Sequence, residues 1–116
     1  MKINVQFFRS AGLYTGFAVS GHDAADINPD TDADFSVLCA AVSSAVQLTC
    51  NTLTECFRVP QEAVSVRPAE NMLNQIALRL ERPDPVQSEI IHGLLIHMQL
   101  LSEDFGSRIS VKTHET

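Results

Sequence analysis

Basic residues are scarce in this chain. Lys and Arg together number 8, against 14 Asp and Glu in 116 residues, and the formal net charge is −6. A surface with this balance repels phosphate groups, which argues against a general nucleic-acid or anionic-membrane surface. We therefore expect no nucleic-acid partner and no membrane partner, and we expect the surface to attract basic proteins.

Cysteines and long apolar runs are also few. Three cysteines, an odd number, do not build a disulfide framework, and Cys39 and Cys50 lie about 16 Å apart along a helix, too far to bridge within one chain. The first residues contain no apolar stretch of signal-peptide length, and no later run approaches the length of a membrane span. These absences predict a cytoplasmic protein.

The chain length fits a single domain, residues 1–116. Apolar–polar alternation and helical spacing predict five strands and two helices. The strands are expected over Lys2–Phe8, Leu13–Ser20, Ala63–Arg67, Met72–Leu80 and Arg108–Lys112, and the helices over Ser36–Phe57 and Val86–Phe105. The order β-β-α-β-β-α-β predicts an α+β fold, in which both helices pack on a single antiparallel-rich sheet.

Each expected helix has an apolar stripe that predicts its buried face. The stripes comprise Leu38, Ala41, Val42, Ala45, Thr49, Leu53 and Cys56 in the first helix, and Ile90, Leu94, Met98 and Leu101 in the second. Pro60 and Gly106 are expected to end the helices. The residues after the last strand are expected to fray.

A thiol and an imidazole flank the expected acidic loop, Asp23–Asp34. Ser36 or Asp34 is the expected N-cap. With Ser36 as N-cap, Cys39 falls in the first turn of its helix, where free N–H groups and the helix dipole favour a thiolate and an oxyanion. His22 follows Gly21 at the end of the second strand and is a candidate proton acceptor. By spacing alone this signal is weak, because Cys and His are more often inert in small domains.

Two short motifs strengthen that interpretation. Ser20-Gly21-His22 and Cys39-Ala40-Ala41-Val42-Ser43, in this element order, resemble the ribosomal-processing cysteine protease family Prp. The resemblance implies a homodimeric, cytoplasmic bacterial protease without cofactor or metal. Its implied substrate is the precursor peptide at the N-terminus of large-subunit ribosomal protein number twenty-seven. By position, His22 matches the catalytic histidine and Cys39 the nucleophile. Ser43 matches a serine of the family motif, which we expect to pack in the core or to contact the substrate. We also expect Gly21 to be a substrate-binding residue.

The chain departs from the family pattern in two places. Its loop is longer than usual, with no glycine between Gly21 and Cys39, and Ser36 stands where the family tends to have Asp. Serine is as good an N-cap as aspartate. If the family's aspartate orients the histidine, that role would be lost here or taken over by Asp34. An alternative therefore stays open, in which the chain is a non-catalytic peptide-binding or ribosome-assembly module of the same fold.

Other features have competing interpretations. Asp26, Asn28, Asp30, Asp32 and Asp34 match the oxygen spacing of an EF-hand loop. Thr31 and Val37 stand where that loop needs Gly and Glu, so a solvated acidic loop is the default and no metal is expected. No glycine-rich phosphate loop is present, and we expect no nucleotide.

The N-terminal strand raises a further alternative. Gln6-Phe7-Phe8 resembles the Leu-Gln-Phe-Phe motif of the family's substrates, so the segment is either a plain edge strand or a pseudo-substrate for a neighbouring molecule. His92 and His97 are expected to be surface or interface residues. Cys50 and Cys56 are expected to be packing residues.

Overall fold

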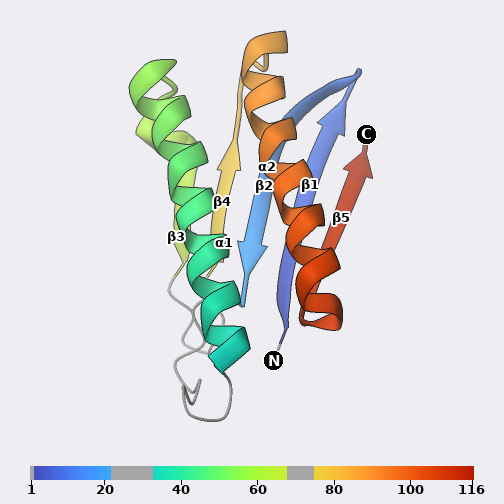
Figure 1. The fold of residues 1–116 in the computed structure, drawn as a ribbon. Helices are drawn as coiled ribbons and strands as arrows, with labels where there is room; N and C mark the ends of the chain where they lie inside the picture. The colour runs from blue at the N-terminus through green and yellow to red at the C-terminus, as the bar shows by residue number, and fades with distance from the viewer. Residues whose placement is uncertain (1, 22–32, 68–74) are drawn as a thin grey trace.

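The computed structural model describes residues 2–21, 33–67 and 75–116. Two helices lie on one face of a five-stranded sheet, in the order β-β-α-β-β-α-β (Figure 1). The strands are β1 (Ile3–Ser10), β2 (Leu13–Ser20), β3 (Val64–Arg67), β4 (Gln75–Arg79) and β5 (Ile109–Glu115), and the helices are α1 (Ala33–Asn51) and α2 (Pro85–Phe105). The predicted fold class is confirmed.

The strand order is β3-β4-β2-β1-β5. Three of the pairings are antiparallel, and β1 pairs with β5 in parallel. β1 is therefore an interior strand, and the expectation that it forms a sheet edge is wrong. The C-terminal residues are also more ordered than expected, because β5 runs to Glu115 and the Thr116 N–H donates to the Arg9 carbonyl at 2.9 Å.

The core lies between the helices and the sheet. In β1 the alternating residues Ile3, Val5 and Phe7 are buried, as their spacing predicts. In α2, Leu94 and Met98 are buried, but Ile91 and Leu95 are buried too, whereas the predicted Ile90 and Leu101 are only half-buried. The buried face of α2 is broader than one stripe because this helix contacts α1 as well as β2 and β5.

The buried face of α1 also differs from the predicted stripe. Phe35, Cys39, Val46 and Cys50 join the core, whereas Cys56 is exposed. Cys56 departs from the predicted stripe because residues Thr52–Cys56 continue α1 as a π-helix. Its wider turn changes the angular spacing of side chains and carries Cys56 away from the sheet.

The helical segment Ala33–Cys56 is long enough and, over an 18-residue window with a mean hydropathy of 1.4, apolar enough to cross a membrane by length and composition. The expectation that no run approaches such a length is therefore wrong. A core helix passes the same test, and this one packs its buried face on the sheet.

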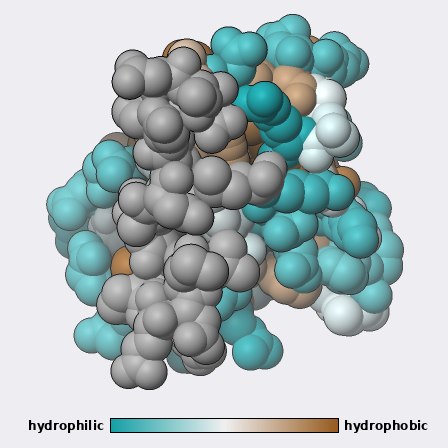
Figure 2. All heavy atoms as spheres, turned by 90° about the horizontal axis from the view of Figure 1, so that it is seen from below, coloured by the Kyte–Doolittle hydropathy of each residue, from teal (hydrophilic) through white to brown (hydrophobic). Residues whose placement is uncertain are grey.

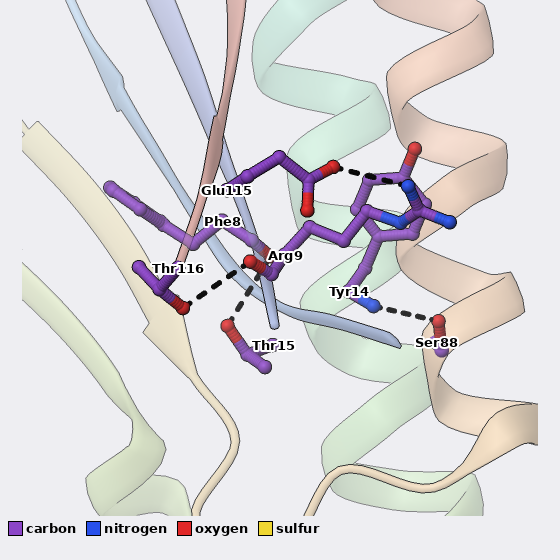
Figure 3. Close-up of polar contacts among 7 residues, drawn as sticks. All are labelled: Phe8, Arg9, Tyr14, Thr15, Ser88, Glu115 and Thr116. Atoms are coloured by element: carbon purple, nitrogen blue, oxygen red, sulfur yellow. Dashed lines mark hydrogen bonds and ion pairs between the residues drawn. The ribbon is translucent and has the colours of Figure 1, made fainter. Parts of the chain in front are cut away.

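Both ends of α2 follow local sequence signals. Asp84 caps the N-terminus by accepting a hydrogen bond from the Gln87 N–H at 2.9 Å, and Pro85 occupies the first turn. Gly106 ends the helix with φ +62°. Near the start of this helix, the buried Ser88 hydroxyl accepts a hydrogen bond from the Tyr14 N–H at 2.8 Å, which ties α2 to the β1–β2 hairpin (Figure 3).

Candidate functional site

The predicted site lies at the end of the molecule where β2 finishes and α1 begins (Figure 1). Among the described residues visible in Figure 2, which looks onto this end, most of the surface is hydrophilic, with a few apolar patches. β2 delivers the chain to this end through Gly21, which is buried and has φ +85°. His22, the predicted base, follows directly and lies outside the described residues, as do loop residues 23–32.

Gly21 is required by its surroundings. A Cβ at this position would lie 2.5 Å from the Lys2 carbonyl oxygen, closer than side chains approach backbone, and its φ lies in the left-handed region that favours glycine. The chain therefore leaves β2 through a backbone conformation that favours glycine. It is built by close contact between the end of β2 and the start of β1.

Cys39 lies in the second turn of α1, which corrects the expected position. The helix begins at or before Ala33, so Cys39 is at least its seventh residue, and neither Asp34 nor Ser36 is a cap. Phe35 stabilises this earlier first turn of α1, because its side chain is 2% exposed and packs into the core on the same side as Leu38. The dipole effect falls off within the first turn, so the helix terminus acts on this thiol more weakly than a first-turn position implies.

Burial places Cys39 at the margin of the core. The residue is 8% exposed, and its helical neighbours one turn away, Phe35 and Val42, are 2% and 0% exposed. Ser43, one turn beyond Cys39 and on the same flank, is half-buried. A Cβ in an α-helix tilts toward the N-terminus, so the Cys39 side chain leans toward the first turn of α1 and the end of the molecule where β2 finishes.

The other two cysteines are in different environments. Burial raises the pKa of the Cys50 thiol from 9.0 to about 11, which keeps it protonated and unreactive near neutral pH. Cys56 is exposed rather than packed. Of the three cysteines, Cys39 alone lies near the end of the molecule where β2 finishes and α1 begins.

The other candidate residues that the structure describes lie apart from the predicted site. Within residues 2–21, 33–67 and 75–116, no three His, Cys, Asp or Glu side chains are placed to hold a metal ion. Most of the EF-hand-like spacing falls outside those ranges, and Asp34 lies in α1. His92 stacks on Tyr14, with ring centroids 5.2 Å apart, and its Nδ1 lies 3.3 Å from Glu89.

Sequence reasoning did not identify a groove between the outer sides of α1 and α2. Its volume is about 610 Å³, and its lining includes Ala41, Ser44 and Leu48 from α1 and Gly93 and His97 from α2. The surface of the lining is mostly apolar. The available signal was the absence of any charged residue between Asp34 and Glu55, which leaves the outer side of α1 uncharged.

Comparison with family models identifies one family. The sequence model of the family described as "Cysteine protease Prp" matches residues 2–110. No curated protein matches the chain. The crystal structure of SMU.848 from Streptococcus mutans is similar with a TM-score of 0.80 at 19% identity, covering 100% of both chains.

Two further structures are of an essential ribosomal processing protease Prp from S. aureus. The complex with a substrate peptide has a TM-score of 0.69 at 16% identity, and the complex with a covalently linked product peptide has 0.64 at 18%. Each alignment covers 97% of this chain and 99% of the other. At these identities the likeness shows a shared fold.

Proposed function

The chain belongs to the cysteine protease Prp family, and from this premise we propose that it removes the N-terminal extension of a bacterial large-subunit ribosomal protein, number twenty-seven, from its precursor. The observation that carries the proposal is the family match over residues 2–110, which includes both Gly21-His22 and Cys39. The S. aureus relatives support it, because they are ribosomal processing proteases bound to a substrate peptide and to a product peptide.

In the proposed mechanism, Cys39 is the nucleophile and His22 the general base. The Cys39 sulfur attacks the scissile carbonyl carbon as its proton passes to the His22 imidazole, which then protonates the leaving amine. Water, deprotonated by His22, hydrolyses the resulting thioester and frees the sulfur. Because Cys39 is in the second turn of α1, stabilisation of the thiolate depends mainly on His22.

Gly21 and Ser43 are proposed to shape the substrate site. Gly21 fixes the direction in which the chain enters residue 22, through its φ of +85°. Ser43 is half-buried on the same flank of α1 as Cys39, where its hydroxyl can meet a bound peptide. The net charge of −6 favours encounter with a basic ribosomal protein, an attraction that salt would weaken.

The direct test is incubation of the purified chain with the full-length precursor, followed by mass spectrometry of the products. We expect one cleavage that removes the extension, loss of that cleavage in Cys39→Ser and His22→Ala, and unchanged cleavage in Cys56→Ser, the matched control with an exposed thiol. Precursor that binds but stays intact would contradict the proteolytic function and favour a non-catalytic module of the same fold.

We also propose that the protein is a cytoplasmic homodimer, as the family resemblance implies. Exposed apolar side chains on the outer sides of the helices support an interface there: Leu48 is 69% exposed, Ile96 47% and Leu100 53%. The groove between α1 and α2 offers a continuous apolar surface. Sedimentation should give twice the mass of the chain, and Leu48→Glu should shift it to the monomer; a monomeric wild type would contradict the proposal.

A further inference from the structure

One face of the sheet carries neither helix, because α1 and α2 lie together on the other (Figure 1). Strand registers identify its side chains: the alternation that buries Ile3, Val5 and Phe7 places their neighbours on the open side. Figure 3 shows the change of side within β1, where Phe8 points away from the helices and Arg9 extends over Tyr14. The open face comprises Lys2, Asn4, Gln6, Phe8, Gly16, Ala18, Ser20, Ser65, Gln75, Ala77, Arg79, Ser110, Lys112 and His114.

The open face concentrates positive charge in an acidic protein. Lys2, Arg79 and Lys112 are three of the chain's 8 Lys and Arg residues. Among the open-face positions named above there is no Asp or Glu. Glu115, at the end of β5, is joined by its carboxylate to Arg9 at 3.1 Å on the helix side. The net charge of −6 therefore does not describe this face, on which basic side chains are present without acidic ones.

The shape and side chains of this face suit an extended polar ligand. Its middle is lined by small or amide-bearing residues, among them Gln6, Ala18 and Ala77, so it is flat. At one end Phe8, 36% exposed, stacks on His114 with ring centroids 5.5 Å apart and planes inclined by 21°. Beside Arg79 and Ser65 lies a hollow of about 1080 Å³, whose lining includes two further arginines, Arg58 and Arg82, and two glutamates, Glu62 and Glu81.

The same features disfavour a second copy of the chain. Two open faces packed together would oppose Lys112, Arg79 and their neighbours with like charges, and Phe8 is the one large exposed apolar side chain on the described part of this face. Proteins that bind single-stranded RNA on a sheet use three kinds of group. Cations contact the phosphates, amides hydrogen-bond to base edges, and an exposed aromatic ring stacks on a base.

We propose that the open face of the sheet binds single-stranded RNA. Lys2, Lys112 and Arg79 contact phosphates along the strands, and the Phe8–His114 pair stacks a base at one end. This inference does not depend on the proposed proteolytic function, since the open face lies opposite the helix that carries Cys39.

The test is fluorescence anisotropy of a labelled 12-nucleotide single-stranded RNA with the full-length chain. Three to four phosphate contacts predict that the logarithm of the association constant falls with the logarithm of salt concentration with a slope of roughly −2 to −3. Arg79→Glu/Lys112→Glu should weaken binding by at least about tenfold. Phe8→Leu, which keeps apolar bulk and removes the ring, should weaken binding by about fivefold or more.

Arg108→Glu is the control, because it reverses one charge outside the strands, in η3 (Gly106–Arg108) before β5; it changes the net charge by two units, where the double variant changes it by four. It should leave the affinity within about twofold, and circular dichroism should show all variants folded. Absence of RNA binding, equal loss in Arg108→Glu, or unchanged affinity in the folded double variant would overturn the proposal. Binding of an acidic peptide or of anionic phospholipid vesicles in preference to RNA would overturn it as well.

Discussion

Gly21 and Lys2 meet so closely that no side chain fits between them. A Cβ on Gly21 would lie 2.5 Å from the carbonyl oxygen of Lys2, at a φ of +85°. This contact joins the end of β2 to the start of β1 and sets the direction in which the chain continues toward His22. The backbone up to Gly21 is therefore fixed by packing at the sheet's lower end in Figure 1.

Gly21→Ala should destabilise the fold and impair cleavage. A non-glycine residue at this φ, pressed against backbone, costs about 1–3 kcal/mol, or roughly 4–10 °C in Tm. Activity measured well below the melting transition should fall as well, because residue 22 leaves β2 in a different direction. Thermal melts and precursor cleavage assays measure the two effects.

Gly93→Ala is the matched control for this substitution. Gly93 lies inside α2 and a Cβ there would meet nothing within 4 Å, so alanine should stabilise the helix by up to ~1 kcal/mol. Equal melting temperatures for Gly21→Ala and the wild type would contradict the strain at Gly21.

The chain should not cleave its own N-terminal strand, despite the substrate-like Gln6-Phe7-Phe8. β1 is paired on one side with β2 and on the other with β5, and Phe7 is 0% exposed. An extended peptide must leave the sheet before a protease can bind it, so the pseudo-substrate alternative is disfavoured. Intact mass should be unchanged after long incubation at native pH; loss of residues 1–8 would show that β1 leaves the sheet.

Stability should decline at alkaline pH because of Cys50. Its folded pKa of about 11 lies above its ordinary value of 9.0, so the folded state holds the proton more tightly than the unfolded state. Below pH 9 both states are protonated and the thiol has no effect; as the pH rises from about 9 to about 11, ionisation of the unfolded chain lowers the free energy of unfolding. Urea unfolding at pH 8 and pH 10 measures this.

Cys50→Ala serves as the control for the alkaline effect. The variant should be less stable overall, since it loses buried volume, but its stability should decline less between pH 8 and pH 10. An identical decline in the variant and the wild type would assign the pH effect to other groups.

Much of the fold is predictable from local patterns. Alternation in β1 identified its buried residues, the expected bounds of β2 are those observed, and Gly106 ends α2 as predicted. These elements are determined by residues within a few positions of one another. The pairing of β1 with β5 is not, because it joins Ile3 to Ile109 across the whole chain and turns the expected edge strand into an interior one.

The candidate site was less predictable for the same reason. Ser36 is a good cap by residue type, but burial of Phe35 favours an earlier helix start and moves Cys39 into the second turn. Cys56 fits the apolar stripe only for a regular α-helix, and the π-helix Thr52–Cys56 removes it from the core. In both places tertiary packing outweighs the local signal.

The rate at which iodoacetamide alkylates Cys39, followed by peptide mass spectrometry from pH 5 to 10, tests the central claim most directly. We predict that Cys39 reacts faster than the exposed Cys56 at pH 7, and that His22→Ala slows Cys39 at least about tenfold while leaving Cys56 unchanged. Because Cys39 is beyond the first turn of α1, most of its activation should disappear with the imidazole. Alkylation of Cys39 no faster than that of Cys56, with no response to His22→Ala, would contradict the account.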